Sequence, residues 1–148
     1  MNILADTCFW ISLCDSADPN HTETISMMSK ITSDQCHSLL VPHPVLYETL
    51  CSQMVKKPTQ VLQLIQCFKT VVKIPDIDYM DKAYDQVEQQ ANMRKGTASM
   101  VDIVIMLMAE DAKNNVKAIL TRNGRDFSSF CRKRGLLMVE NMAILQAI

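Results

Sequence analysis

Four acidic residues stand where apolar segments of this sequence give way to polar ones, namely Asp6, Glu48, Asp102 and Asp126. Asp6 ends a short apolar run at the N-terminus, and Asp126 lies in the polar turn after the run that ends at Thr121. If these runs are parallel strands, their carboxyl ends meet at one edge of a sheet, where open α/β folds place their sites. Carboxylates brought together there repel one another and raise each other's pKa values unless a cation lies among them. The pattern therefore predicts a Mg²⁺ or Mn²⁺ site.

The chemistry expected of such a site is hydrolysis of a phosphodiester. Magnesium takes oxygen ligands, keeps several waters and uses only a few carboxylates. A metal in that setting lowers the pKa of a bound water, orients it for attack on phosphorus and neutralises charge on the leaving oxygen. Hydroxyl, amide and guanidinium groups near the acids can position water or phosphate, and the candidates are Thr7, Thr121, Arg122, Asn123 and Arg125.

Each of the four acids also has a purely structural interpretation. Asp6 precedes a predicted helix and is of the type that caps helices by accepting backbone N–H bonds. Glu48 lies one turn inside another predicted helix, where an exposed acid gains from the helix dipole. Ser99 and Asp102 have the spacing of a capping box, and Asp126 is a common turn residue. Their joint position near strand ends and helix starts is what favours a site over these separate roles.

The elements that must position these acids alternate along the chain. Short apolar runs predict strands at 2–6, 38–42, 71–74, 118–121 and 136–139. Segments with helical spacing predict helices at 8–14, 20–31, 44–57, 59–68, 77–95 and 99–114. Strands that alternate with helices imply right-handed crossovers and a parallel sheet covered on both faces. We therefore expect one domain over residues 1–148, with a three-layer α/β/α fold around a parallel sheet of about five short strands.

Helical spacing also defines the apolar faces of two predicted helices. The 59–68 helix keeps five apolar side chains for burial, which are Val61, Leu62, Leu64, Ile65 and Phe68. The 77–95 helix is expected to end at Gly96, and its apolar face comprises Ile77, Met80, Tyr84, Val87 and Ala91. The segment 103–109 is apolar all round, so we expect a buried helix that places Asp102 at the sheet edge.

Composition bounds the class of protein. Of the 148 residues 48% are apolar, the net charge is −1, and the six cysteines lie far apart without a C-x-x-C pair, so we expect reduced thiols in a cytoplasmic protein. The near-neutral charge argues against non-specific coating of nucleic acid. The N-terminus lacks a basic leader and the apolar run 103–109 is short, so neither secretion nor membrane insertion is expected. The histidines and cysteines lack the spacing of zinc ligands.

Four short motifs occur in order along the chain: ILADT at 3–7, PVLYE at 44–48, GTASMVD at 96–102 and LTRNGRDF at 120–127. The first is weak alone, but the four together span essentially the whole sequence. In this order they resemble the PIN domain, and most closely the small VapC-like toxin ribonucleases of bacterial toxin–antitoxin pairs. The resemblance implies a PIN-like fold and a metal-dependent ribonuclease that hydrolyses RNA.

The resemblance also implies a set of site residues and partners. The acidic cluster would comprise Asp6, Glu48, Asp102 and a fourth member, for which Asn123 and Asp126 compete. Asp126 is preferred because a carboxylate is the better cation ligand. Such proteins commonly form homodimers and are held inactive by a small antitoxin protein, for which we expect a surface on the early helices that includes Trp10 and Met27–Met28. Two alternatives stay open: a PIN-like scaffold without activity and a receiver-like magnesium-binding module.

Overall fold

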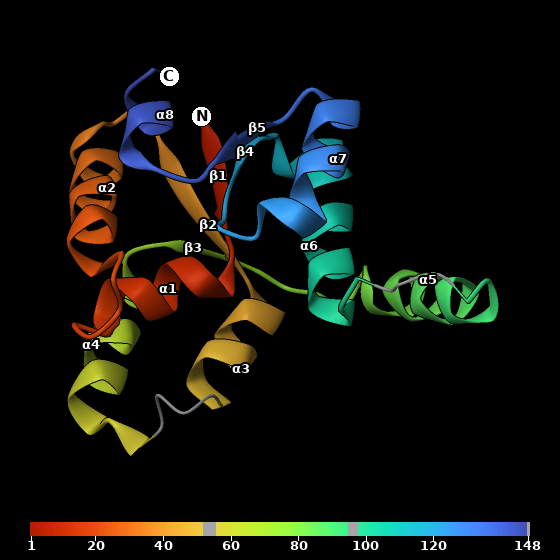
Figure 1. Ribbon diagram of the computed structural model, residues 1–148, viewed down its shortest axis with the longest axis horizontal. Coiled ribbons are helices and arrows are strands. Elements are labelled where there is room, and N and C mark those ends of the chain that lie inside the picture. The colour runs from red at the N-terminus through yellow and green to blue at the C-terminus, as the bar shows by residue number, and fades with distance from the viewer. Residues whose placement is uncertain (52–55, 95–97, 148) are drawn as a thin grey trace.

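Five strands form one all-parallel sheet at the centre of the molecule (Figure 1). The computed structural model describes residues 1–51, 56–94 and 98–147. The strand order is β3-β2-β1-β4-β5, and the strands are β1 (Asn2–Ala5), β2 (Ser38–Pro42), β3 (Val72–Ile74), β4 (Val116–Leu120) and β5 (Leu137–Val139). The parallel five-stranded sheet predicted from the sequence is confirmed, and each strand overlaps its predicted range.

The apolar runs form strands because the middle of the sheet is covered on both faces. Ile3 of β1 lies in register with Leu39 of β2 and with Ala118 of β4. All three side chains are buried. A strand buried on both faces has no solvent side and therefore needs no alternation of polar residues. This is why β1 and β4 are recognisable in the sequence as continuous apolar segments.

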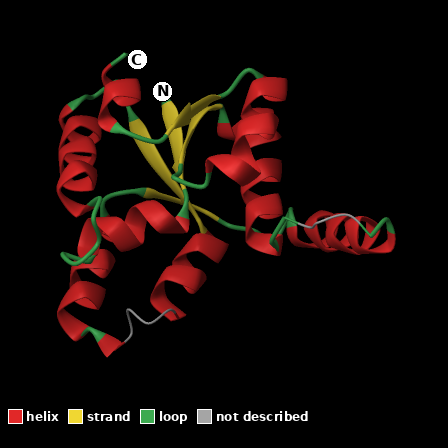
Figure 2. Ribbon diagram, in the orientation of Figure 1, coloured by secondary structure: helices red, strands yellow, loops and turns green. Residues whose placement is uncertain are grey.

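The helices lie on the two faces of this sheet (Figure 2). They are α1 (Thr7–Cys14), α2 (His21–Ser33), α3 (His43–Cys51), α4 (Pro58–Lys69), α5 (Met80–Asn92), α6 (Met100–Glu110), α7 (Gly124–Arg134) and α8 (Met142–Gln146), with a 3₁₀ turn at Ala112–Asn114. One group of helices, α1, α2 and α4, lies on one side of the strands, and a second group, α6 and α7, lies on the other (Figure 1). The predicted three-layer arrangement is thus confirmed. Within the described ranges, none of the helices combines the length and apolar character needed to cross a membrane.

The strand order creates a switch point between β1 and β4. From β1 the chain moves through α1 and α2 to β2 on one side, whereas from β4 it moves through α7 to β5 on the other. Because both crossovers of a parallel sheet are right-handed, the two connections lie on opposite faces. In open α/β sheets ligands bind at the carboxyl ends of the strands beside such a point. The segments that follow β1 and β4 are therefore the first place to look for a site.

A buried aromatic cluster fixes α1 beside this switch point. Trp10 is fully buried, and its ring packs edge-to-face on Phe9 and Phe68, with centroids 5.4 and 4.9 Å away. Met27 of α2 is buried as well. The prediction that Trp10 and Met27–Met28 offer an exposed partner surface is therefore wrong for Trp10 and Met27. Their apolar side chains cover the sheet instead, which is the ordinary use of a helix face beside a core.

Helical spacing overstated how much of α4 is buried. Leu64 and Phe68 are buried as predicted, but Leu62 is 62% exposed and Ile65 is 37% exposed. The core covers a narrower strip of this helix than its apolar residues define. Of the predicted 44–57 helix, α3 is described as far as Cys51, residues 52–55 lie outside the described residues, and Lys57 is the N-cap of α4. Gly96 also lies outside the described residues.

Much of the apolar face predicted for the 77–95 segment lies in solvent rather than on the core, although Val87 of α5 is half-buried against it. Ile77 is 77% exposed, Met80 is 45% exposed and Tyr84 is 63% exposed. The helix packs on α6 and projects away from the sheet, as the right-hand side of Figure 1 shows. Spacing identifies the apolar side of a helix but not whether the same chain covers it.

Candidate functional site

Asp6 occupies the position between β1 and α1 at the carboxyl edge of the sheet. Its carboxylate accepts hydrogen bonds from the Thr7 backbone N–H at 2.6 Å and from the Thr121 hydroxyl at 2.8 Å. The Cys8 thiol lies 3.3 Å from the same oxygen that Thr121 contacts. Only 7% of Asp6 is exposed. Asp6 is thus the N-cap of α1, as one interpretation of the sequence had it, and it also lies at the switch point.

Thr121 joins the end of β4 to the end of β1. While its hydroxyl donates to Asp6, the same oxygen accepts the Asn123 backbone N–H at 3.0 Å. The Asp6 backbone N–H in turn donates to the Leu120 carbonyl at 3.0 Å. Two turns that are distant in the sequence are therefore held together by side-chain and backbone bonds. The role predicted for Thr121 beside the acids fits this position.

Glu48 reaches the same edge from α3. The Thr7 hydroxyl donates to Glu48 Oε2, so the residue after Asp6 connects the two acids. Glu48 is itself exposed, whereas Thr7 is buried. The second crossover therefore places a solvent-accessible carboxylate beside the buried one. We refer to Asp6, Thr7, Glu48, Asp102 and Thr121 together as the Asp6 site.

Asp102 serves a capping box and also acts on Asp6. Its carboxylate accepts the Ser99 backbone N–H at 3.2 Å and the Ser99 hydroxyl at 2.8 Å, and the Asp102 backbone N–H donates back to that hydroxyl at 3.1 Å. The reciprocal bonds satisfy orphan N–H groups at the start of α6. The negative charge of Asp102 is one of the causes that raise the pKa of Asp6. The contacts of Asp102 therefore confirm its capping role, whereas its role in a metal site stays a prediction.

Burial dominates the electrostatics of Asp6. Loss of hydration raises the pKa of the carboxyl above its ordinary value, because a buried carboxylate is poorly solvated. Hydrogen bonds from Thr121, Cys8 and Thr7 act in the opposite direction, and the charge of Asp102 adds to the rise. A positive charge at this edge would favour the ionised form of Asp6, which is the behaviour expected of a cation ligand.

Asp126 lies in the first turn of α7 rather than in the polar loop expected from the sequence, and its carboxylate is held by neighbouring residues. Asn123 donates its side-chain amide to Asp126 at 2.6 Å, and the Arg125 guanidinium lies 3.2 Å from the other carboxylate oxygen. Both contacts lower the pKa of Asp126, that from Asn123 most. Asp126 also borders a groove of about 950 Å³ between α5, α6 and α7. Because the side chains of Asn123 and Asp126 are hydrogen-bonded to each other, their positions do not distinguish between them. The preference for Asp126 as the fourth site residue stays a prediction.

The close cluster of four acids expected from the sequence is not found. Within residues 1–51, 56–94 and 98–147, no three side chains of His, Cys, Asp or Glu are grouped as a metal site requires. The carboxylates of Asp102 and Asp126 are both engaged by hydrogen bonds from their own turns. Magnesium, however, is commonly bound through one or two carboxylates together with water. The oxygen donors of Asp6, Asp102 and Glu48 fit that requirement chemically.

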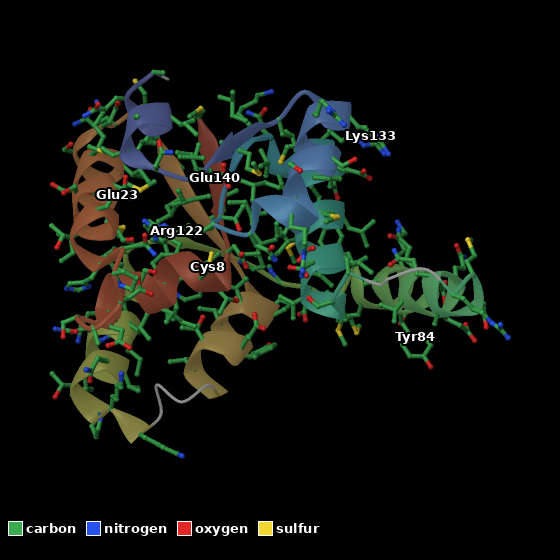
Figure 3. The ribbon with its side chains drawn as sticks, in the orientation of Figure 1. Cys8, Glu23, Tyr84, Arg122, Lys133 and Glu140 are labelled. Atoms are coloured by element: carbon green, nitrogen blue, oxygen red, sulfur yellow. The ribbon has the colours of Figure 1, made fainter. Side chains whose placement is uncertain are left out.

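The two arginines of the last motif point to different places. Arg122 donates to the Thr24 hydroxyl at 2.8 Å and lies 3.3 Å from Glu23, so its guanidinium binds α2 (Figure 3). The side chain of Arg125 is 90% exposed, and among the described residues its ion pair is with Asp126. Of the two, Arg125 is therefore the one free to meet a phosphate. The positioning role assigned to Arg122 remains a prediction, and its contacts tie β4 to α2.

Cys8 and Ser99 contact the acids directly, yet the sequence did not single them out for that. The Cys8 sulfur lies 3.3 Å from Asp6 and accepts the Arg122 backbone N–H at 3.3 Å. Burial, with the neighbouring Asp6 charge, raises the pKa of Cys8 to about 11, so the thiol is neutral at pH 7 and can donate. The only signal for Cys8 was its place two residues after Asp6, while Ser99 was recognisable as a cap alone.

Comparison with solved structures identifies the fold. Neither a family model nor a curated protein matches the sequence. The solved structures that match in shape include the Mycobacterium tuberculosis VapC20 toxin, which cleaves the sarcin–ricin loop, and VapBC2 from Rickettsia felis bound to a DNA fragment from their promoter. The first has a TM-score of 0.66 at 17% identity and covers 86% of this chain and 94% of its own. The second has a TM-score of 0.62 at 16% identity and covers 93% and 97%. The chain has a PIN-domain fold of the VapC type.

Proposed function

We propose that this protein is a metal-dependent endoribonuclease and the toxin of a toxin–antitoxin pair. The observation that carries the proposal is the Asp6 site: a buried carboxylate at the switch point, bonded to Thr121, linked through Thr7 to Glu48 and influenced by the charge of Asp102. The VapC-type fold supports the same proposal, since VapC20 is a toxin that cleaves the sarcin–ricin loop. The cytoplasm, expected from the composition, is the compartment we propose.

The chain's own residues position the reaction. Asp6 and Asp102, with Glu48 on the solvent side, are the residues that would hold Mg²⁺ or Mn²⁺. When bound, such an ion supplies an activated water and neutralises charge on the leaving oxygen. Thr121 and Cys8 hold one oxygen of Asp6, and Thr7 orients Glu48. The exposed guanidinium of Arg125 is available for the RNA backbone.

Cleavage of RNA should require a divalent ion. We expect the purified protein to cut at least one RNA in a mixed pool of single strands and stem–loops, including a sarcin–ricin-type loop, in Mg²⁺ or Mn²⁺. Addition of EDTA should abolish cutting, because the proposed oxygen donors contain no alternative source of an activated water. Products are resolved by gel electrophoresis and sequenced at their ends. Cleavage that persists in EDTA at full rate would contradict the metal-dependent mechanism.

Two non-catalytic alternatives make different predictions. A receiver-like module is disfavoured by topology, because in flavodoxin-like receivers β1 lies between β2 and β3, whereas here it lies between β2 and β4. A PIN-like scaffold would keep the fold and act only through protein contacts. It would bind its partner with or without intact acids, and it would leave every RNA in the pool uncut.

The antitoxin remains a proposed partner of unidentified sequence. The VapBC2 structure is a complex with promoter DNA, which supports a partner that binds both toxin and DNA. Because Trp10 and Met27 are buried, the contact surface on the early helices has to use other side chains. Ile25 of α2 and Leu62 of α4 are exposed apolar residues that remain available there.

The exposed face of α5 is the surface we assign to the homodimer. Met80 and Tyr84 of α5 are exposed, as is Ile77 in the turn before the helix. Met100, at the start of α6, is 39% exposed and lines the same surface hollow as Met80. An apolar stripe of this kind in solvent is typical of an interaction surface. A second copy would present the same stripe, so that the two faces bury one another around a two-fold axis.

Tyr84→Glu should weaken this dimer. A charge placed at the centre of an apolar interface is desolvated on association, and we expect the dissociation constant to rise by about tenfold or more. Sedimentation equilibrium of wild type and variant measures the change. Gln89→Glu adds the same charge to an exposed position of the same helix and should have no comparable effect. Equal dimerisation of all three proteins would place the interface elsewhere.

A further inference from the structure

The guanidinium of Arg122 is bound at two points by α2. Its Nη1 donates to the Thr24 hydroxyl at 2.8 Å, and its Nη2 lies 3.3 Å from Glu23 Oε2, on the α2 side of the molecule (Figure 3). Only 19% of the Arg122 side chain is exposed, and Thr24 is fully buried. A planar guanidinium with two partners has a fixed orientation. We refer to these contacts of Arg122 with Glu23 and Thr24 as the Arg122 anchor.

The backbone of Arg122 belongs to the turn that holds Asp6. Its N–H donates to the Cys8 sulfur at 3.3 Å, and that sulfur lies 3.3 Å from an Asp6 oxygen. Thr121, directly before Arg122, donates its hydroxyl to Asp6 at 2.8 Å. Asn123, directly after it, donates its N–H to the Thr121 hydroxyl at 3.0 Å. The residue that α2 anchors is thus the middle residue of the turn that contacts the buried carboxylate.

Glu23 connects the same anchor to the C-terminal helix. While its Oε2 takes the Arg122 guanidinium, its Oε1 accepts the backbone N–H of Met142 at 3.0 Å. Met142 is the first residue of α8, where backbone N–H groups have no partner within the helix. One carboxylate therefore joins α2, α8 and the turn after β4.

We propose that Glu23 is a positioning residue of the Asp6 site, which acts through Arg122 to fix the turn from Thr121 to Asn123 and couples that turn to α8. The inference rests on the proposed nuclease function, and it assigns the Arg122 guanidinium to the protein scaffold rather than to the RNA. Loss of the Glu23 carboxylate leaves the guanidinium with one partner, so the turn gains freedom. A small displacement of a positioning group slows the chemical step more than it weakens substrate binding.

The first test needs neither RNA nor metal. NMR measures amide hydrogen exchange in the full-length wild type, in Glu23→Ala and in Glu23→Gln, which keeps an acceptor oxygen but removes the charge. In Glu23→Ala we expect the Arg122 and Asn123 amides to exchange at least about fivefold faster, relative to an amide that reports global unfolding. Leu4, fully buried in β1, supplies that reference amide. Thr22→Ala, at the exposed neighbouring position of α2, should leave the ratio unchanged.

The second test separates positioning from contact with RNA. Glu23→Ala should lower kcat about tenfold and leave KM within about twofold of wild type. The double variant Glu23→Ala/Arg122→Ala should be no slower than Arg122→Ala alone, because both changes remove the same anchor. In EDTA, Arg122→Ala should bind a fluorescein-labelled single-stranded RNA with the salt dependence of wild type. Arg125→Ala should lower the slope of that dependence by about one, as loss of a phosphate contact does.

Three results would overturn the proposal: unchanged exchange of the turn amides in both Glu23 variants, losses of kcat that add in the double variant, or a salt slope that falls in Arg122→Ala. Glu23→Gln keeps the exchange test decisive if Glu23→Ala fails to fold. Faster exchange of the turn amides in a protein that cuts no RNA would support the anchor and refute the proposed nuclease. The two failures are therefore distinguishable.

Discussion

Asp6→Asn should abolish metal-dependent RNA cleavage, with a fall in rate of at least about a hundredfold. The substitution keeps the size and planar shape of the side chain. Its amide oxygen can still accept the Thr7 backbone N–H that caps α1. What it removes is the negative charge at the switch point, which is the feature that a cation requires. The measurement is the initial rate of cleavage of the preferred RNA under saturating Mg²⁺ or Mn²⁺.

The same substitution should stabilise the metal-free protein at neutral pH. The folded protein raises the pKa of Asp6 chiefly by burial, so the ionised carboxylate is less favourable in the folded state than in the unfolded chain. A group of this kind favours folding when protonated, and that benefit is lost as pH rises through its folded pKa. The advantage of Asn over Asp in the free energy of unfolding should therefore shrink as pH is lowered toward that pKa. Urea denaturation at several pH values measures it.

Asp81→Asn is the matched control for this experiment. Asp81 is an exposed acid in the first turn of α5, away from the switch point. Its replacement removes one charge but should leave the cleavage rate within about twofold of wild type. Full activity in Asp6→Asn would mean that the buried carboxylate serves only as a helix cap, and the proposed nuclease site would then be wrong.

The sequence was sufficient to predict the sheet because its central strands are buried on both faces. Residues such as Ile3 and Ile119 are fully buried, and a continuous apolar run is the sequence form of such a strand. The same physical signal fails on α4 and α5. Leu62 and Tyr84 are apolar at helical spacing, but whether another element covers them depends on packing that spacing does not contain.

The sequence predicted only those parts of the candidate site that directly follow a strand. Asp6 and Thr121 both follow central strands. The parallel sheet brings the Thr121 hydroxyl to 2.8 Å from a carboxylate oxygen of Asp6. The contact between Thr7 and Glu48 depends on the angle at which α3 leaves β2, which no pattern in the sequence encodes. Local bonds explain why Asp102 and Asp126 did not join a tight cluster. Ser99 and Asn123 are close in sequence and engage those carboxylates first.

Ser99→Ala and Asp102→Asn should separate the two roles of Asp102. Ser99→Ala removes the hydroxyl that caps α6 but leaves the Asp102 carboxylate, so it should cost about 1 kcal/mol in the free energy of unfolding. Its cleavage rate should stay within about twofold of wild type. Asp102→Asn leaves the Ser99 cap in place and keeps an oxygen for the Ser99 backbone N–H. It should therefore lose little stability but about a hundredfold or more in cleavage rate.

The two variants are informative because loss of a helix cap lowers stability more than activity, whereas loss of a cation ligand lowers activity more than stability. If Asp102 acts only through the capping box, activity should follow stability, and Ser99→Ala should be the more damaged enzyme. If Asp102 acts on the reaction, activity and stability should dissociate as described. An Asp102→Asn protein with wild-type cleavage would remove Asp102 from the site. Because the Asp102 charge raises the pKa of Asp6, its removal should also lower that pKa, which NMR titration of Asp6 detects without any RNA.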